Sequence, residues 1–317
     1  MKSCSLEAAV AFYLESRRRL GFALREEGAL LENLVAYAQE THHRGPLTTA
    51  LAVNWAQVPP PNQPHGRAHR LEIVRHFARF WAVFDPRTQI PPPGLLGPAY
   101  RRRPVHIYTP EEILLLSEAA QQLPSPPTLY PQTFSTLLGL LACTGLRISE
   151  ALRLELTDWQ PDTAVLTVRR SKFGRSRHVP LSPSATARLN TYLQARAQAW
   201  PKTANGALFL DPRGRRLAYW QVNDTFRQLR QQLGWQDQRL RPRLHDLRHT
   251  FAVNCLLGWY RQGPAELDAK VFSLAVYLGH RNLRHTYWYL TAVPELLALG
   301  TARWAKVFAA KKGGGHE

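Results

Sequence analysis

Apolar side chains in residues 1–85 recur at the spacing that lines them along one face of a helix. The pattern predicts helices around Leu6, Ala9, Val10 and Tyr13; Leu30, Leu31, Leu34 and Tyr37; Leu51, Val53 and Trp55; and Ile73, Phe77, Phe80 and Trp81. The other face of the last helix carries Arg67, Arg70, Arg75 and Arg79. That helix can pack on one side and contact phosphates on the other, although an arginine face turned to water fits the pattern equally well.

The helical pattern stops in residues 86–106, where proline and arginine dominate. This range contains Pro91-Pro92-Pro93-Gly94 and Arg101-Arg102-Arg103-Pro104. Because proline favours an extended chain and arginine attracts phosphates, we predict a basic linker here. It joins a helical domain of residues 1–85 to a larger domain of residues 107–308, which a flexible tail of residues 309–317 follows.

The larger domain begins with a helix-start signal, since Thr109-Pro110-Glu111-Glu112 has the form of a capping box with proline at the first helical position. Further helices are predicted at residues 134–146, 183–198, 218–233, 244–258, 265–278 and 294–308. Residues 165–168 and 178–181 are β-prone and enclose Lys172-Phe173-Gly174-Arg175, which predicts a hairpin with Lys172 near its tip. The predicted fold class is mostly α with a small β-hairpin or sheet, a helical N-terminal domain preceding a mixed α/β domain.

The charge of the chain narrows the choice of partner. Its 317 residues carry a formal net charge of +18, which makes a polyanion the first partner to consider. No apolar run reaches the ~20 residues of a membrane-spanning helix, and the N-terminal residues lack a signal-peptide core. Cys4, Cys143 and Cys255 offer neither a disulfide framework nor a zinc pattern. We therefore expect a cytoplasmic protein with no membrane partner.

Lysine is rare in this chain. Only seven of the 41 basic residues are lysines, and Lys172 is the only one between residues 3 and 201. A GC-rich genome can produce such an arginine bias. A position that stays lysine against it is a candidate for chemistry that needs an ammonium group with an adjustable pKa.

Two short segments place basic side chains where a phosphate could bind. His245 and Arg248 share one face of a predicted helix, although such a pair is more often structural. Thr144-Gly145-Leu146-Arg147 turns between two helices and puts Arg147 near a helix N-terminus, where anions are favoured. Glu150, one turn later, can hold Arg147 or orient His245. A capped helix corner is the alternative interpretation.

An aromatic stretch follows His280. Tyr287 and Tyr289 lie two residues apart within it, so on a helix they point in nearly opposite directions and one at most faces a given site. Aromatic residues at this density usually form core.

Four segments resemble, in order and in rough spacing, the successive motifs of the tyrosine recombinases, a phage-integrase-like family: ACTGLRISEALRL, SKFGRSRHVPLS, LHDLRHTFA and YLGHRNLRHTYWYL. Each motif alone is modest evidence, and the four together cover most of residues 109–300 and are specific. The helical domain of residues 1–85 resembles the core-binding, DNA-contacting domain of that family in placement and helical character. HTFAVNCLLGWYRQG and TYWYLTAVPELL are most similar to integrases of mobile elements, and the sequence leaves integration, excision, transposition and replicon resolution open as the outcome.

The resemblance implies six catalytic residues, namely Arg147, Lys172, His245, Arg248, His280 and Tyr289. The two arginines would clamp the scissile phosphate, and Tyr289, chosen for its spacing of nine residues from His280, would attack phosphorus to leave a 3′-phosphotyrosyl link. Lys172 would protonate the leaving 5′-oxygen, and His245 would accept the tyrosine proton.

The same resemblance implies three supporting features. His280 would hydrogen-bond the phosphate, and Glu150 would support the site. Arginines of the helical domain, the linker and the hairpin would contact DNA; they are Arg67, Arg70, Arg75, Arg79, Arg101, Arg102, Arg103 and Arg175. Exchange of one phosphodiester for another needs no cofactor, neither ATP nor metal.

The implied partners are double-stranded DNA and further copies of the chain, which would form a tetramer on DNA. DNA-bending proteins or a partner recombinase are possible accessory partners. The implied location is the bacterial nucleoid in the cytoplasm. The segment from Gly258 to Phe272 is longer than the family pattern, and the sequence indicates neither its role nor the target site.

Three other functions compete with recombination. A type IB topoisomerase shares the tyrosyl chemistry, and a non-cutting DNA-binding regulator shares the fold. A His-dependent metallonuclease is weaker, because the histidines lack carboxylate partners at ligand spacing.

Overall fold

The computed structural model describes residues 5–58, 64–98, 104–124, 129–169, 176–201, 203, 205–236, 241–262, 267–279, 282, 286, 287, 289, 298 and 301. The chain divides into two compact units, residues 1–103 and 104–317. Their boundary falls inside the range predicted as a linker.

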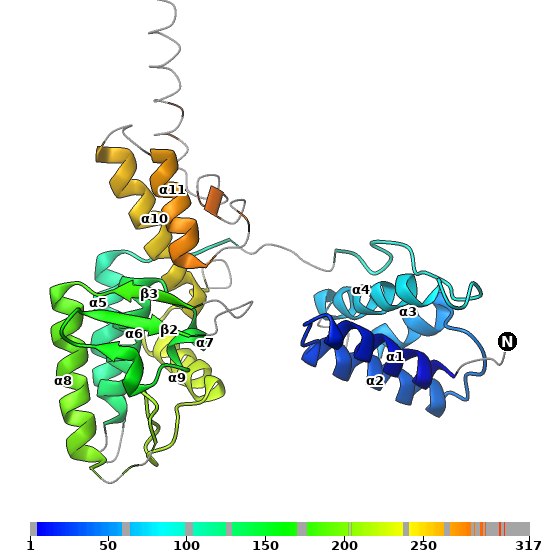
Figure 1. Ribbon diagram of the computed structural model, residues 1–317, viewed down its shortest axis with the longest axis horizontal. Helices are drawn as coiled ribbons and strands as arrows, with labels where there is room; N and C mark the ends of the chain where they lie inside the picture. Colours follow the sequence, from blue (N-terminus) through cyan, green and yellow to red (C-terminus); the bar gives the residue numbers. More distant parts are fainter. Residues whose placement is uncertain are drawn as a thin grey trace, which may run out of the picture. The chain divides into compact units, whose positions relative to one another are not determined.

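The first unit consists of helices α1 (Leu6–Arg19), α2 (Arg25–Glu40), α3 (Thr49–Gln57) and α4 (Pro64–Trp81), coloured blue to cyan in Figure 1. Helix α4 contacts the other three. Trp55, Phe77 and Leu34 are fully buried at the centre. The hydroxyl groups of Ser5 and Thr48 cap α1 and α3 by accepting backbone N–H hydrogen bonds. The helical pattern predicted for this region is confirmed.

Residues 86–98, the first part of the predicted linker, pack against this unit. The Gln89 N–H donates to the Leu47 carbonyl at 2.9 Å, and the Gln89 side chain accepts from the Thr49 N–H at the same distance. The Arg75 guanidinium donates to the Pro91 carbonyl, and Leu96 packs against the core. This part of the proline-rich segment is therefore fixed to the first unit.

The second unit is built around α6 (Tyr130–Thr144), which contacts α5 (Pro110–Gln121), α8 (Pro183–Ala199) and α10 (Leu244–Gln262). Among the described residues of this unit, the other helices are α7 (Ile148–Ala151), η1 (Leu156–Asp158), α9 (Tyr219–Gln232) and α11 (Leu267–Leu278). The capping box predicted at Thr109 is present, with the Thr109 and Glu112 side chains each accepting a backbone N–H of the other residue. Helix α6 buries most of its residues because apolar side chains occur on nearly all its faces.

A three-stranded antiparallel sheet completes this unit, in the order β1 (Trp159–Gln160), β2 (Val165–Val168), β3 (Arg177–Pro180). Strands β2 and β3 confirm the predicted hairpin, with β3 beginning one residue earlier than expected. Leu166 pairs with Val179, and both are fully buried. The two-residue strand β1 was not predicted, since it is too short to show alternation.

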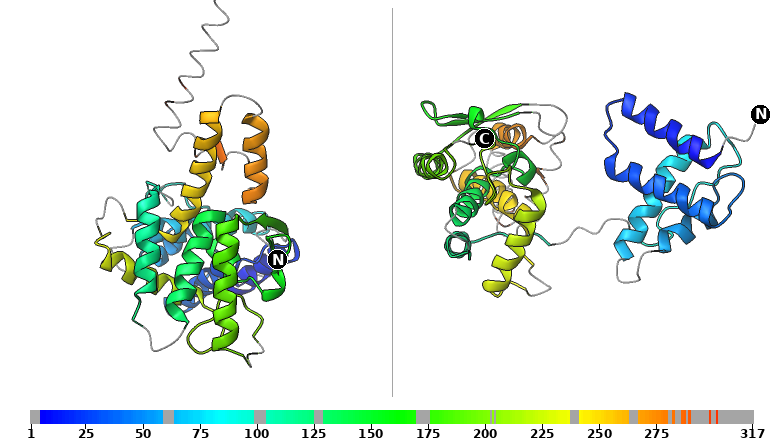
Figure 2. Two further views of the ribbon diagram at one scale, coloured as in Figure 1. Left: turned by 90° about the vertical axis from the view of Figure 1, so that its left-hand side faces the viewer. Right: turned by 90° about the horizontal axis from the view of Figure 1, so that it is seen from below.

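Helices α10 and α11 lie side by side and share a small core of their own (Figure 1; Figure 2). Leu256, Leu274 and Leu278 form this core together with Tyr289. The predicted fold class, mostly helical with a small sheet, is confirmed. Among the described residues, no helix has both the length and the apolar character to cross a membrane.

Candidate active site

Two arginines from distant parts of the sequence are held by backbone carbonyls at the ends of two helices. Arg248 of α10 is 2% exposed and donates to the carbonyls of Gly145 at 2.7 Å and Leu278 at 2.5 Å. Arg147, at the start of α7, donates to the carbonyl of Gly279 at 3.3 Å.

These carbonyls belong to the C-terminal ends of α6 and α11, where the helix dipole is negative and carbonyls lack intrahelical partners. That arrangement favours positive charge and offsets the repulsion between the guanidinium groups. Burial, followed by the charge of Arg147, lowers the pKa of Arg248 to about 10, so Arg248 stays protonated at neutral pH.

A third arginine joins the site through Glu150. The buried Glu150 carboxylate accepts from Arg147 Nη1 at 2.8 Å and from Arg177 Nη1 and Nη2 at 3.1 and 2.7 Å. It also accepts from the Arg147 N–H, so the carboxylate occupies the start of α7. Burial alone would raise the pKa of Glu150, but the hydrogen bonds and charges of Arg177 and Arg147 lower it to about 2. Glu150 was predicted either to hold Arg147 or to orient His245, and the structure shows it bound to Arg147.

Arg177 did not emerge from the sequence as a site residue. It begins β3, and its side chain is 13% exposed. The only signal was its place in the hairpin motif, five residues after Lys172.

Tyr289 is 3% exposed and packs in the core shared by α10 and α11. Its hydroxyl lies 3.2 Å from Nδ1 of His249 and is close to the charge of the Arg248 guanidinium. Burial raises the pKa of Tyr289 while the charges of Arg248 and Arg147 oppose this, and the phenol is protonated at neutral pH. Tyr287, by contrast, is 44% exposed. The geometry thus favours Tyr289 over Tyr287 as the tyrosine of this site.

Two histidines of α10 lie on the same face as Arg248. The rings of His245 and His249, one turn apart, meet edge to face with their centroids separated by 4.7 Å. His245 is exposed at the edge of the site, and partial desolvation and the charge of Arg248 lower its pKa. A neutral imidazole is therefore present at neutral pH. His249 was not predicted as a site residue, although its spacing of four from His245 was visible in the sequence.

Comparison with known proteins identifies the family. The sequence pattern of the phage integrase family matches residues 107–295. A putative integrase/recombinase, y4rB, of Sinorhizobium fredii is 44% identical over 299 residues, covering 91% of this chain and 93% of the relative.

The chain belongs to the phage integrase family. Tyrosine recombinase XerD of Caulobacter vibrioides is 31% identical over 238 residues, covering 74% of this chain and 73% of the relative. Among solved structures, the Tn1549 transposon integrase in complex with transposon right end DNA has the same fold, with a TM-score of 0.65 at 17% identity, over 95% of this chain and all of that one. At the level of its family, this chain is a tyrosine-type recombinase, and site-specific recombination is the activity of that family.

Within this recombinase, four of the six predicted catalytic residues lie in the described part of the chain: Arg147, His245, Arg248 and Tyr289. Contacts link Tyr289 to Arg248, and both arginines to the carbonyls at the end of α11. Lys172 and His280 lie outside the described residues, as do Arg101, Arg102, Arg103 and Arg175. Their predicted roles stay predictions.

The arginines predicted on the first unit differ in their surroundings. Arg70 lies 3.9 Å over the Trp55 ring and donates to the Trp55 carbonyl, and Arg75 donates to Glu72 and to the carbonyl of Pro91. Arg67 is half-buried and Arg79 is exposed. These contacts show that Arg70 and Arg75 stabilise the first unit. DNA contact by any of the four arginines stays a prediction.

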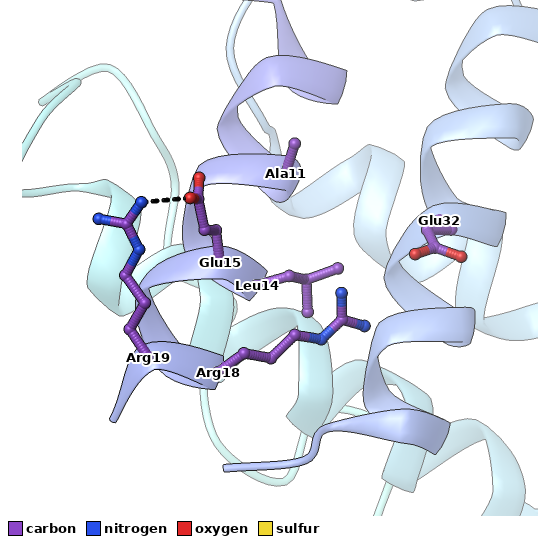
Figure 3. A pocket seen from close by; sticks show the side chains of 6 residues that line it. All are labelled: Ala11, Leu14, Glu15, Arg18, Arg19 and Glu32. Carbon is purple, nitrogen blue, oxygen red and sulfur yellow. Dashed lines mark hydrogen bonds and ion pairs between the residues drawn. The ribbon is translucent and has the colours of Figure 1, made fainter. Parts of the chain in front are cut away.

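The recombinase also has a hollow between α1 and α2 in its first unit (Figure 3). Its rim carries Arg18 and Arg19 together with Glu15 and Glu32, and Arg19 is paired with Glu15 at 2.5 Å. Its two arginines and two glutamates balance in charge, so this hollow has no excess of positive charge to bind an anion. Nowhere in the described ranges do three or more His, Cys, Asp or Glu side chains gather as a metal ion would require.

Proposed function

We propose that this chain is a site-specific DNA recombinase or integrase that cleaves and rejoins duplex DNA through a 3′-phosphotyrosyl intermediate at Tyr289. One observation carries the proposal: a buried tyrosine hydroxyl contacts both an arginine and a histidine, beside a second arginine. A buried phenol next to two guanidinium groups suits a nucleophile that attacks a phosphate bound by the same cations.

Each group of the site has a role in this chemistry. Arg147 and Arg248 bind the non-bridging oxygens of the scissile phosphate and stabilise the charge that grows in the transition state. Because their guanidiniums are fixed by carbonyls and by Glu150, they are oriented before DNA arrives. His245 supplies a neutral imidazole at the edge of the site.

The roles proposed for the remaining two residues rest on the family motifs. Lys172 protonates the leaving 5′-oxygen, and His280 hydrogen-bonds the phosphate. The exchange conserves a phosphodiester bond, so neither ATP nor a metal ion enters the scheme.

Double-stranded DNA is the proposed substrate. The net charge of +18 and the DNA-bound Tn1549 integrase of the same fold support this. The names of the relatives, integrase/recombinase and tyrosine recombinase, favour recombination over topoisomerase-like relaxation. We further propose assembly into a tetramer on DNA, assistance by DNA-bending or partner recombinase proteins, and residence at the nucleoid.

A non-cutting DNA-binding regulator is the second candidate. It shares the fold and would keep the basic surface, but it has no use for a hydroxyl held by Arg248 and His249. The contacts of Tyr289 therefore favour the cutting enzyme.

Covalent trapping tests the proposal. Nicked duplexes from the DNA that flanks the coding sequence are first selected for binding to the protein, then incubated with it in EDTA and denatured in SDS. We expect a protein–DNA adduct that disappears with Tyr289→Phe and persists with the matched control Tyr287→Phe. Loss of the adduct with Tyr287→Phe alone would contradict the assignment of the nucleophile. No adduct on bound DNA would favour the regulator.

A further inference from the structure

The hydroxyl of Tyr289 lies beside His249, to which the motif comparison assigned no role. His249 Nδ1 is 3.2 Å from the hydroxyl oxygen, and the two ring centroids are 5.4 Å apart with the planes inclined at 62°. Tyr289 is 3% exposed, so bulk water has little access to it. A side chain beside the hydroxyl is therefore better placed than bulk water to receive its proton.

The hydrogen-bond partners indicate the direction in which this proton moves. The nearby Arg248 guanidinium cannot accept this proton, because it has donors and no acceptor. The hydrogen bond between the hydroxyl and the imidazole therefore gives the hydroxyl hydrogen a path to His249. Nδ1 of His249 accepts this hydrogen when Nε2 carries the ring proton.

His245 helps to hold the acceptor in place. Its ring meets the ring of His249 edge to face at 4.7 Å, with the planes inclined at 86°. This contact, one helical turn away, restricts the plane of the imidazole that faces Tyr289. Of the two histidines, His249 is the one with a hydrogen bond to the hydroxyl at the distance needed for direct transfer.

The geometry points to His249 as the catalytic residue that takes the hydroxyl proton when Tyr289 attacks DNA, an inference that rests on the phosphotyrosyl function proposed above. The tyrosine O–H bond breaks, its proton moves to His249 Nδ1, and the O–P bond forms. The bond from phosphorus to the 5′-oxygen breaks, and that oxygen takes a proton from Lys172. In rejoining, the 5′-hydroxyl attacks phosphorus and returns its proton to the neutral Lys172 amine, and Tyr289 leaves and takes back the proton from His249.

The first test uses the free protein. We expect nitrogen NMR of the ¹⁵N-labelled histidine rings to show His249 protonated at Nε2, with an Nδ1 resonance that shifts when Tyr289→Phe removes the hydroxyl. Protonation at Nδ1, or an unchanged resonance in the variant, overturns the inference.

The second test measures single-turnover cleavage of a nicked duplex that the wild type binds. His249→Asn places an amide oxygen near the position of Nδ1, where it can accept a hydrogen bond but not a proton. We expect the rate to fall by about 10²–10⁴-fold, the range typical of general base catalysis, with DNA affinity and melting temperature unchanged. A rate within about threefold of wild type overturns the inference, because loss of general base catalysis costs far more than that.

Two control variants separate His249 from the other acid–base groups. If His245 were the acceptor, His245→Asn would show the large loss and His249→Asn would not. A duplex with sulfur in place of the leaving 5′-oxygen needs no proton on its leaving group. We therefore expect it to rescue Lys172→Ala but not His249→Asn, and rescue of both variants overturns the inference.

The outcomes also distinguish this inference from the proposed function. If the wild type forms an adduct and His249→Asn forms it equally fast, only the role of His249 fails. If the wild type forms no adduct on DNA that it binds, the phosphotyrosyl function fails, and the role of His249 fails with it.

Discussion

Arg177 forms a bidentate pair with Glu150: Nη1 donates to Oε1 at 3.1 Å and Nη2 donates to Oε2 at 2.7 Å. This fork-to-fork geometry connects strand β3 to the carboxylate that also orients Arg147. The position of Arg147 therefore depends on a residue that the sequence alone did not single out.

Replacing Arg177 tests this connection. Arg177→Ala leaves Glu150 buried with one of its two cationic partners missing, and breaking a buried pair in this way typically costs about 3–5 kcal/mol of unfolding free energy. We expect that range in urea denaturation, together with a loss of DNA cleavage through the misplaced Arg147. The matched control is Arg227→Ala, which removes an exposed pair with Asp224 and should cost less than about 1 kcal/mol. Equal costs for the two variants would contradict the structural role of Arg177.

The pKa of Glu150 predicts how stability depends on acid. Its pKa is about 2 in the folded chain against 4.5 without these contacts, so its contribution is complete above pH 4.5 and is lost as the pH falls toward 2. The shift corresponds to a contribution on the order of 3 kcal/mol. We expect Glu150→Gln to flatten the decline in unfolding free energy measured between pH ~3 and ~5. An unchanged slope would show that other carboxylates cause the decline.

Two glycines near α6 should respond to alanine in opposite ways. Gly145 has φ of +62°, and a Cβ there would lie 2.5 Å from Cδ1 of Phe251. Gly145→Ala should destabilise the protein by about 2–4 kcal/mol, from left-handed strain and overpacking. Gly139 lies within the helix with open space around it, so Gly139→Ala should stabilise by about 0.5–1 kcal/mol. Thermal melts of the two variants are the measurement, and a shift of the same sign in both would refute it.

Arg79 and Arg70 of α4 provide a test of DNA contact by the first unit. Exposed Arg79 should contribute to DNA binding without affecting the fold, so Arg79→Ala should weaken binding and lower the slope of log affinity against log salt by about 1. Arg70→Ala should instead destabilise the protein by about 1–2 kcal/mol, because it loses the Trp55 ring and carbonyl. A normal salt slope for Arg79→Ala would remove that residue from the DNA surface.

The sequence predicted most of the helices because each carries a local signal. Apolar spacing marked α1 to α4, and the capping box marked the start of α5 within the segment Thr109-Pro110-Glu111-Glu112. The same reasoning located Arg147, Arg248 and Tyr289, whose motifs stand in a recognisable order. In the sequence, Tyr287 and Tyr289 differ only in their spacing from His280; in the structure, their exposed fractions of 44% and 3% separate them.

What the sequence did not predict depends on partners far along the chain. Arg177 meets Glu150 across 27 residues, and His249 meets Tyr289 across 40. Arg70 and Arg75 bind the carbonyls of Trp55 and Pro91, which lie 15 and 16 residues away. No local pattern specifies such pairings, because they follow from how the elements pack.

The carbonyls that hold the two arginines come late in the sequence, so they determine when the site can form during synthesis. Arg147 and Arg248 leave the ribosome before Leu278 and Gly279, whose carbonyls complete their attachment. In a nascent chain that ends before α11, Arg147 and Arg248 lack the carbonyls of Gly279 and Leu278, and Tyr289 is absent. In the proposed function, a cutting site therefore cannot form during synthesis until α11 and Tyr289 have been made.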